Sequence, residues 1–187
     1  MDHRGTDNAI LNRRSCRSYE QTKNVTSEMM REIIQAGTGA PSGTNSQPWR
    51  FSVLQGEAKS EYIQTLRACL ELKKGDMSKE AENIAFWFCT SLEKSSVVML
   101  VWDKEKSWTS GQSIGACIQT MLKAYGLGLG TLWVVAVRWG GEEATKKYCH
   151  PDWELIAAVG VGYSSEKMIG KKGPPRLTVD QVAEFLG

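Results

Sequence analysis

The sequence predicts a single domain, over residues 1–187, in which a central β-sheet is covered by helices. The chain contains no repeat, low-complexity tract or linker, and it is long enough to bury a proper core. Short β-branched apolar runs, typical of buried strands, are separated by long stretches with helical spacing. Tight hairpin turns do not join consecutive runs, which favours a sheet flanked by helices.

The predicted helices follow from spaced apolar residues and from capping signals. Residues 26–37 are the clearest case, because Thr26 or Ser27 can cap the start of this helix. At the end of the chain, Thr178 and Gln181 have the spacing of a capping box. The other predicted helices cover residues 7–12, 56–74, 79–93, 110–125, 141–148 and 178–185.

Four strands are predicted between these helices. The run 97–102 is β-branched and bounded by polar residues, as expected of a buried strand. The run 155–163 is rich in Ala, Val and Gly, which fits a strand packed on both faces. A glycine-rich loop, residues 126–131, is expected to lead from a helix into the strand 132–137. The remaining strand covers residues 51–55.

Residues 40–51, APSGTNSQPWRF, connect the helix 26–37 to that last strand. The opening Pro-Ser-Gly-Thr-Asn run is too rich in turn formers to continue a helix. Its small and polar residues would let backbone N–H groups, hydroxyls and amides approach a flat polar ligand closely. An ordinary helix-to-strand connection explains this stretch equally well, so other parts of the chain must decide between the two interpretations.

The segment Arg13-Arg14-Ser15-Cys16-Arg17 is a second candidate site. Guanidinium groups present forked donors that match phosphate oxygens, and a Ser hydroxyl or N–H can add another donor. A solvated basic turn is the alternative interpretation. Cys16 is expected to be a spectator whose N–H matters more than its thiol.

The run Phe86-Trp87-Phe88 lies on a predicted helix in a chain with seven tryptophans. Successive helical residues point about 100° apart, so three adjacent aromatic side chains cannot all face one core. We expect at least one of them to face a partner subunit or a ligand pocket.

Composition and charge argue against several classes of protein. A net charge of +2 is too small to indicate a nucleic-acid or membrane surface, and the basic clusters lack the interleaved aromatic residues of a nucleic-acid-binding face. The apolar runs are too short to span a bilayer, and the N-terminus has no stretch of signal-peptide length. The five cysteines form no CxxC pair and fit reduced thiols in a cytoplasmic protein.

Common catalytic motifs are also missing from the sequence. The GLGLGT run follows a helix and precedes a strand, whereas the dinucleotide-binding GxGxxG motif follows a strand and opens a helix. The sequence contains no GxxxxGK[ST], GxSxG or HExxH motif, and His3 and His150 are its only histidines. A P-loop, a hydrolytic triad and a His-based metal site are therefore not expected.

Taken in order, spaced motifs over nearly the whole chain resemble the flavin-dependent nitroreductase family. The matching segments are RRSCRSY (13–19), APSGTNSQPWRF (40–51), AYGLGLGTLWV (124–134), AAVGVGYSSE (157–166) and KKGPPRLTVDQV (171–182). Several motifs in the right order are much more specific than any one of them. The resemblance implies an α+β fold with a mostly antiparallel sheet flanked by helices. It also implies an intertwined homodimer with two FMN sites at the interface.

The resemblance also assigns cofactor contacts to residues of this chain. The implied phosphate contacts are Arg13, Ser15, Arg176 and Lys172. Arg14 would lie near the ribityl chain, and Arg17 would approach the pyrimidine edge of the flavin ring. The loop expected to reach the flavin held mainly by the other subunit comprises Pro41, Ser42, Gly43 and Asn45. The backbone expected against ring atoms N5 and O4 belongs to Gly128, Leu129 and Gly130.

The chain departs from larger members of the family in two ways. Those members carry an acidic residue in the loop at N5 and long lid insertions, whereas this loop is Gly-Leu-Gly and the middle region is short. Lid residues and mid-chain ring contacts are therefore not assigned, and Asn83 and Lys104 are not convincing matches for the latter.

A flavin cofactor would explain why the sequence shows no catalytic His or Cys, because the cofactor itself carries the electrons. Arg17 would stabilise negative charge near N1 and O2 of the reduced ring. The implied enzyme is a ping-pong oxidoreductase in which NAD(P)H reduces FMN and an electron-poor nitroaromatic or quinone is then reduced. Two alternatives stay open. One is a specialised flavoenzyme of the same fold, such as a dehalogenase, a flavin-fragmenting enzyme or an azoline-type oxidase; the other is a non-catalytic flavin-binding protein.

Overall fold

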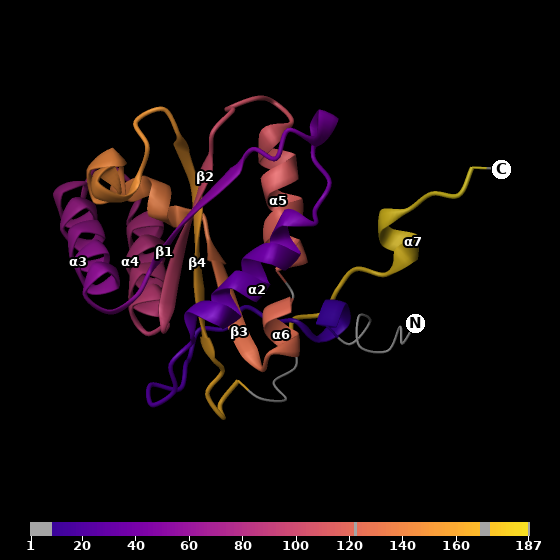
Figure 1. Cartoon of the computed structure of the whole chain (residues 1–187), viewed down its shortest axis with the longest axis horizontal. Helices are drawn as coiled ribbons and strands as arrows, with labels where there is room; N and C mark the ends of the chain where they lie inside the picture. Colours follow the sequence, from indigo (N-terminus) through magenta and orange to yellow (C-terminus); the bar gives the residue numbers. More distant parts are fainter. Residues whose placement is uncertain (1–8, 122, 169–172, 187) are drawn as a thin grey trace.

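The computed structural model describes residues 9–121, 123–168 and 173–186. At its centre is a four-stranded sheet in which every neighbouring pair is antiparallel and the strand order is β1-β2-β4-β3 (Figure 1). The strands are β1 (Trp49–Leu54), β2 (Val97–Asp103), β3 (Leu129–Val134) and β4 (Glu154–Tyr163). The predicted α+β fold with an antiparallel sheet is confirmed.

Strand β2 explains why both faces of the sheet are covered. All of its residues are buried, and successive side chains of a strand point to opposite faces. One hydrophobic cluster therefore receives Val97, Met99 and Val101. The cluster on the other face receives Val98, Leu100 and Trp102. A strand of this kind requires a helical layer on each side.

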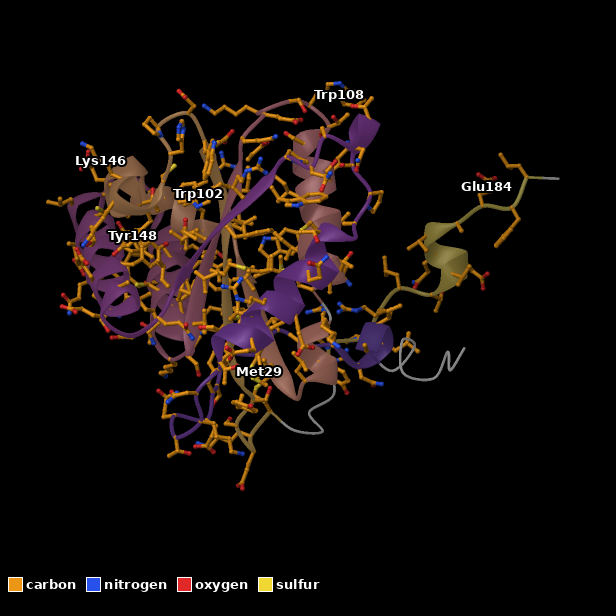
Figure 2. The ribbon with its side chains drawn as sticks, viewed as in Figure 1. Met29, Trp102, Trp108, Lys146, Tyr148 and Glu184 are labelled. Carbon is orange, nitrogen blue, oxygen red and sulfur yellow. The ribbon has the colours of Figure 1, made fainter. Side chains whose placement is uncertain are left out.

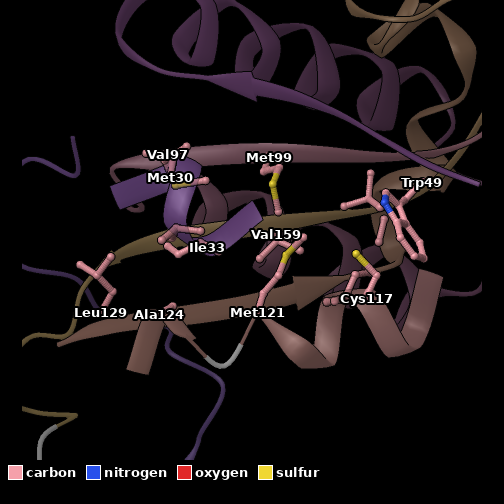
Figure 3. Close-up of a cluster of buried hydrophobic side chains, with 14 of the residues drawn as sticks. Met30, Ile33, Trp49, Val97, Met99, Cys117, Met121, Ala124, Leu129 and Val159 are labelled. Carbon is pink, nitrogen blue, oxygen red and sulfur yellow. The ribbon is translucent and has the colours of Figure 1, made fainter. Parts of the chain in front are cut away.

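Helices provide those two layers (Figure 1). On one face lie α2 (Ser27–Thr38), α5 (Ser110–Thr120) and α6 (Lys123–Gly126). On the other lie α3 (Gly56–Leu72) and α4 (Lys79–Glu93). Figure 3 shows how the first layer packs Met30, Ile33, Cys117 and Met121 against the sheet. Full burial of each large apolar side chain contributes about 1.5–3 kcal/mol.

The helices α2, α3 and α4 begin and end within two residues of the predicted bounds. Local capping explains two of these starts. The Thr26 hydroxyl accepts a hydrogen bond from the Met29 N–H at 3.3 Å, and the Ser78 hydroxyl accepts one from the Ala81 N–H at 3.2 Å. Each bond satisfies a backbone donor that the first turn of a helix leaves unpaired.

The prediction of one continuous helix over residues 110–125 is wrong. Helix α5 ends at Thr120, and the Met121 N–H contacts the carbonyl oxygens of both Cys117 and Ile118 at 3.2 Å. A shared donor of this kind is typical of a helix that tightens before it ends. The separate turn α6 then leads to β3.

The predicted boundary between the glycine loop and the third strand is also wrong. β3 begins at Leu129, so Leu129, Gly130 and Thr131 belong to the strand, where they pair with β4. The strand ends at Val134 because Val135 adopts helical dihedral angles and opens the 3-10 turn η2 (Ala136–Gly140). The pairing with β4, which residue preferences do not reveal, sets these limits. In a smaller shift, β1 starts at Trp49 and not at residue 51.

Two further predicted helices are shorter than expected. The helix over residues 141–148 is replaced by two 3-10 turns, η3 (Glu142–Ala144) and η4 (Lys146–Tyr148). The last helix, α7 (Val179–Val182), has the predicted capping box between Thr178 and Gln181, but Ala183 is extended and ends it.

The last part of the chain, residues 173–186, forms an arm that extends away from the sheet and its helices (Figure 1). The arm contains apolar side chains that are between 61% and 86% exposed: Leu177, Val179, Val182, Phe185 and Leu186. Figure 2 shows Glu184 near the tip of the arm, far from Trp102 in the core. In the described part of the chain, these side chains are therefore largely unpacked.

In the described part of the chain, no helix combines the length and the apolar character needed to cross a bilayer. All five cysteines are free thiols.

Candidate functional site

The basic segment near the N-terminus is attached to the edge strand β3. Ser15 forms a parallel bridge with Thr131, and the Cys16 N–H donates to the Thr131 carbonyl oxygen at 2.8 Å. Cys16 is buried against Gly130, where a Cβ atom would lie 2.5 Å from the Cys16 Cβ and 2.7 Å from its Sγ. Only glycine allows this close approach. The arginine segment and the glycine motif, more than 100 residues apart in sequence, are thus held together.

Three arginines from the two ends of the chain converge beside this attachment. Burial, the guanidinium of Arg176 and the guanidinium of Arg14, in that order, lower the pKa of Arg13. Repulsion of this kind requires like charges that lie near one another. Among the described residues, no carboxylate forms an ion pair with Arg13, Arg14 or Arg176. A cluster of cations without an internal counterion can accommodate a bound anion.

Arg14 lies flat against the start of the C-terminal arm. A Cβ atom at Gly173 would lie 2.6 Å from the Arg14 Cδ and 2.7 Å from its Cζ, so the glycine permits this contact. The Arg14 Nη1 donates to the carbonyl oxygens of Leu11 at 2.8 Å and Arg13 at 2.7 Å. Its Nε is buried and has no hydrogen-bond partner among the described residues. Since buried donors are normally satisfied, this N–H is suited to an external acceptor.

Arg17 extends from the same segment toward α4. Its Cζ lies 5.1 Å from the centre of the Trp87 ring, and its Nη1 donates to the Ser15 carbonyl oxygen at 3.3 Å. Trp87 is 50% exposed, whereas Phe86 and Phe88 pack against the core. Of the three aromatic residues, Trp87 is thus the one most exposed at the surface, and its contact with a partner subunit or a ligand pocket stays a prediction.

The residues of the predicted glycine segment, 128–130, differ in burial and in contacts. Gly128 is exposed at the turn before β3, but its N–H already donates to the Tyr125 carbonyl oxygen at 3.0 Å. Leu129 contributes to the core, and Gly130 lies beneath Cys16. Contact of this backbone with a flavin stays a prediction.

The loop that contains Pro41, Ser42, Gly43 and Asn45 is exposed and conformationally strained. The 3-10 turn η1 (Gly43–Asn45) occupies its middle, and Thr44, Asn45 and Gln47 all have positive φ angles of 47–58°. The Ser42 Oγ accepts from the Gln47 N–H at 3.1 Å and helps to hold this shape. Non-glycine residues in this region cost free energy and concentrate at functional sites.

Within one chain, this loop and the arginine cluster do not come together. Figure 1 places the loop at the upper end of the molecule, beyond the end of α2 and near the start of α5. The helical turn of residues 9–12, which precedes Arg13, lies at the lower right beside the arm. A site that uses both would need the loop of a second chain.

The remaining predicted contact, Lys172, lies outside the described residues. A cavity of about 650 Å³ elsewhere in the molecule contains none of the predicted site residues. Its lining includes Trp102 and Lys146, which Figure 2 shows on the side of the sheet away from the arm. In the part of the chain that the structure describes, no group of three His, Cys, Asp or Glu side chains could hold a metal ion.

Sequence reasoning missed two residues of the site. Gly173 was not assigned a role, although a glycine between a basic pair and two prolines is a sign of close packing or a turn. Trp87 was identified only as one of three aromatic residues, because sequence spacing does not show which partner an exposed ring has.

Comparisons with known proteins show the family of the chain and its fold. Residues 10–163 match the sequence model described as the Nitroreductase family. Over 126 residues the chain is 32% identical to the putative NADH dehydrogenase/NAD(P)H nitroreductase of Methanothermobacter thermautotrophicus, covering 67% of this chain and 58% of that relative. Over 54 residues it is 41% identical to the putative NAD(P)H nitroreductase YdgI of Bacillus subtilis, covering 29% of this chain and 26% of that relative. The chain thus spans less than two thirds of these two relatives.

Solved structures with low sequence identity share the fold. The crystal structure of the FMN-dependent nitroreductase NfnB from Mycobacterium smegmatis in complex with NADPH matches with a TM-score of 0.81. The two chains are 15% identical, and the match covers 98% of this chain and 99% of that one. A BluB-like flavoprotein from Clostridium difficile also matches with a TM-score of 0.81, at 20% identity, over 97% of this chain and 99% of that one.

Proposed function

Because the chain belongs to the nitroreductase family, we propose that it is a single-domain FMN-dependent oxidoreductase that uses NAD(P)H as electron donor. The observation that carries this proposal is the packing of Gly173 against Arg14, which brings the arm that contains Arg176 to the Arg13–Arg14 pair beside β3. These cations come from opposite ends of the chain, and the described residues offer them no carboxylate. The phosphate dianion of FMN would supply the missing counterion.

The residues present fit this cofactor. Arg13, Arg176 and the Ser15 hydroxyl would bind the phosphate, and charge-assisted hydrogen bonds of this type are about twice as strong as neutral ones. The buried Arg14 Nε, to which the described residues offer no acceptor, would donate to an oxygen of the ribityl chain. Arg17, which no described carboxylate neutralises, would stabilise negative charge at the pyrimidine edge of the ring.

When bound, FMN would take a hydride from NAD(P)H and pass two electrons to a nitroaromatic or quinone acceptor, in ping-pong order. The protein's part is to bind and orient the ring, and this chemistry needs no side chain as acid, base or nucleophile. The free thiols of all five cysteines support a reducing compartment, and we place the protein in the cytoplasm.

The active form would be an intertwined homodimer. The apolar side chains of the arm, residues 173–186, stay exposed in the described part of the chain, and a second copy could cover them. The Pro41–Asn45 loop lies too far from the arginine cluster of the same chain to share a ligand with it (Figure 1). Exchange of arms between two copies would bury the apolar residues, and the loop of one copy would reach the flavin of the other.

The first test is flavin binding by the purified protein. We expect flavin absorption bands, or their appearance when FMN is added to the apoprotein. Arg176→Gln should weaken FMN binding by about tenfold or more, because a hydrogen bond to a charged group contributes about 1.5–3 kcal/mol. Arg67→Gln is the matched control, since Arg67 pairs with Glu93 at 2.9 Å on the α3–α4 surface. A colourless protein that gains no flavin bands would overturn the proposal.

The second test separates the oxidoreductase from the alternatives. Under anaerobic conditions, NADH or NADPH should bleach the flavin, and quinones or nitroaromatics should restore its colour. A flavin that neither nicotinamide reduces would favour a specialised flavoenzyme of this fold. A flavin that is reduced but passes electrons to no acceptor would favour a flavin-binding or sensing protein.

A further inference from the structure

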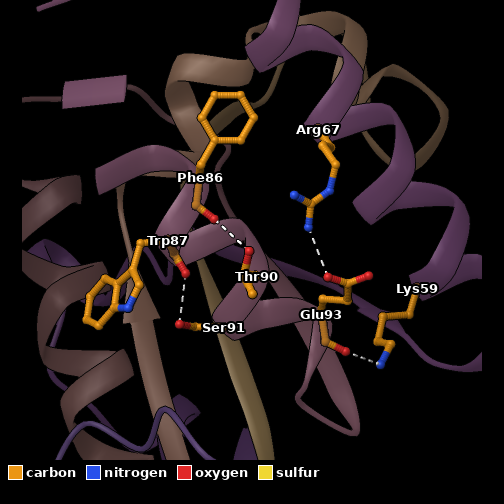
Figure 4. Close-up of polar contacts among 7 residues, drawn as sticks. All are labelled: Lys59, Arg67, Phe86, Trp87, Thr90, Ser91 and Glu93. Atoms are coloured by element: carbon orange, nitrogen blue, oxygen red, sulfur yellow. Dashed lines mark hydrogen bonds and ion pairs between the residues drawn. The ribbon is translucent and has the colours of Figure 1, made fainter. Parts of the chain in front are cut away.

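Trp87 is a large apolar side chain that the fold leaves at the surface. It lies on α4 between Phe86 and Phe88, which pack against the core, and half of its surface is exposed. Figure 4 shows the Trp87 and Phe86 rings leaving the helix in different directions. The Ser91 hydroxyl donates to the Trp87 carbonyl oxygen at 2.9 Å, and Ser91 is buried, so the helix backbone at Trp87 is well held.

The guanidinium of Arg17 lies over the Trp87 ring. The Arg17 Cζ lies 5.1 Å from the ring centre, within the range in which a guanidinium and an aromatic face attract each other. No carboxylate of the described residues pairs with Arg17, and its Nη1 donates to the Ser15 carbonyl oxygen at 3.3 Å. Trp87 is thus the main side-chain partner of Arg17.

Hydrogen bonds hold the backbone next to Arg17, and the contact with Trp87 restricts its long side chain. Cys16 is bound to β3 through the Thr131 carbonyl oxygen, and the Tyr19 hydroxyl donates to the Cys16 carbonyl oxygen at 3.0 Å. An exposed Arg side chain would otherwise sample many rotamers. Arg17 is exposed, and a guanidinium has five N–H donors, so donors beyond the one bonded to Ser15 could reach a ligand.

We propose that Trp87 is a positioning residue, which holds the Arg17 guanidinium where it meets the pyrimidine edge of bound FMN. This inference rests on the proposed function. Trp87 would act through Arg17 and not by contacting the ring itself. By restricting Arg17 before FMN binds, the indole would raise FMN affinity and make the midpoint potential of the bound flavin less negative.

The test compares Trp87→Leu, which removes the aromatic face, with Trp87→Phe, which keeps one. FMN dissociation constants and midpoint potentials are measured for both. Trp87→Leu should weaken FMN binding about two- to fivefold, the equivalent of an exposed cation–π contact, and shift the potential to more negative values. Trp87→Phe should recover most of both properties. Ile84→Ala is the matched control, because Ile84 is an exposed apolar residue one turn earlier on α4.

A double-mutant cycle decides whether Trp87 acts through Arg17. In an Arg17→Gln background, Trp87→Leu should change neither affinity nor potential. An effect that persists in this background, or a Trp87→Leu variant that equals the wild type in both properties, would overturn the inference. If the wild-type protein binds no FMN, the proposed function fails instead. Circular dichroism of each variant identifies losses that arise from misfolding.

Discussion

At Gly130, two segments that are distant in sequence can pack together because this residue has no side chain. A Cβ atom there would collide with the Ser164 hydroxyl and with the Cys16 Cβ and Sγ. Cys16 lies between Ser15 and Arg17 in the arginine segment. The geometry of the arginine segment therefore depends on a glycine in β3.

We predict that Gly130→Ala lowers the free energy of unfolding by about 1–3 kcal/mol, the usual cost of overpacking. It should also weaken FMN binding, because the Arg13–Arg17 segment would be displaced from β3. Chemical denaturation and FMN titration measure the two effects. Gly126→Ala is the matched control, since a Cβ atom there meets nothing within 4 Å. Equal stability of the two variants would contradict the prediction.

At the scale of elements, α2 links the core to the strained loop. Its start is capped by Thr26, and its buried Met30 and Ile33 anchor it to the sheet. At its C-terminal end the chain enters the loop with three positive φ angles. A loop in this conformation can persist only if the helix that precedes it is firmly placed.

We predict that Thr26→Ala destabilises the protein by about 1 kcal/mol, because the Met29 N–H loses its acceptor. Thr26→Ser, which retains the hydroxyl, should stay within a few tenths of a kcal/mol of the wild type. Thermal unfolding of the three proteins provides the measurement. A Thr26→Ser variant as unstable as Thr26→Ala would assign the loss to the methyl group instead of the cap.

The ends of helices and strands were predictable where capping residues or apolar spacing mark them. They were unpredictable where pairing between strands sets them. Capping residues and apolar spacing identified α2 and α4 to within one residue. The start of β3 was missed because Leu129, Gly130 and Thr131 have no strand signal of their own. They are extended because they pair with β4, where their partners are Tyr163, Gly162 and Val161, respectively.

For the whole molecule, the C-terminal arm is the feature that a single chain does not explain. Residues such as Phe185 and Leu186 are more than 80% exposed, and the arm also carries Arg176 to the arginine cluster. The same segment thus connects the proposed cofactor site with the proposed dimer.

We predict that truncation after Arg176 shifts most of the protein from dimer to monomer, because the apolar residues of the arm are removed. Sedimentation velocity gives the oligomeric state, and flavin absorbance gives the occupancy. The full-length Phe185→Ser variant should weaken the dimer in the same direction. A truncated protein that remains a stable dimer would show that the arm is not part of the interface.

The sequence by itself determined the family, the antiparallel α+β fold and the residue types that suit a phosphate and a flavin ring. These follow from ordered motifs and from local periodicity, which do not require knowledge of the packing. Only the tertiary structure decided that Arg13 meets Arg176, that Gly130 makes room for Cys16 and that Trp87 lies under Arg17. Contacts between residues so far apart in sequence depend on strand order and helix placement, and no local preference encodes them.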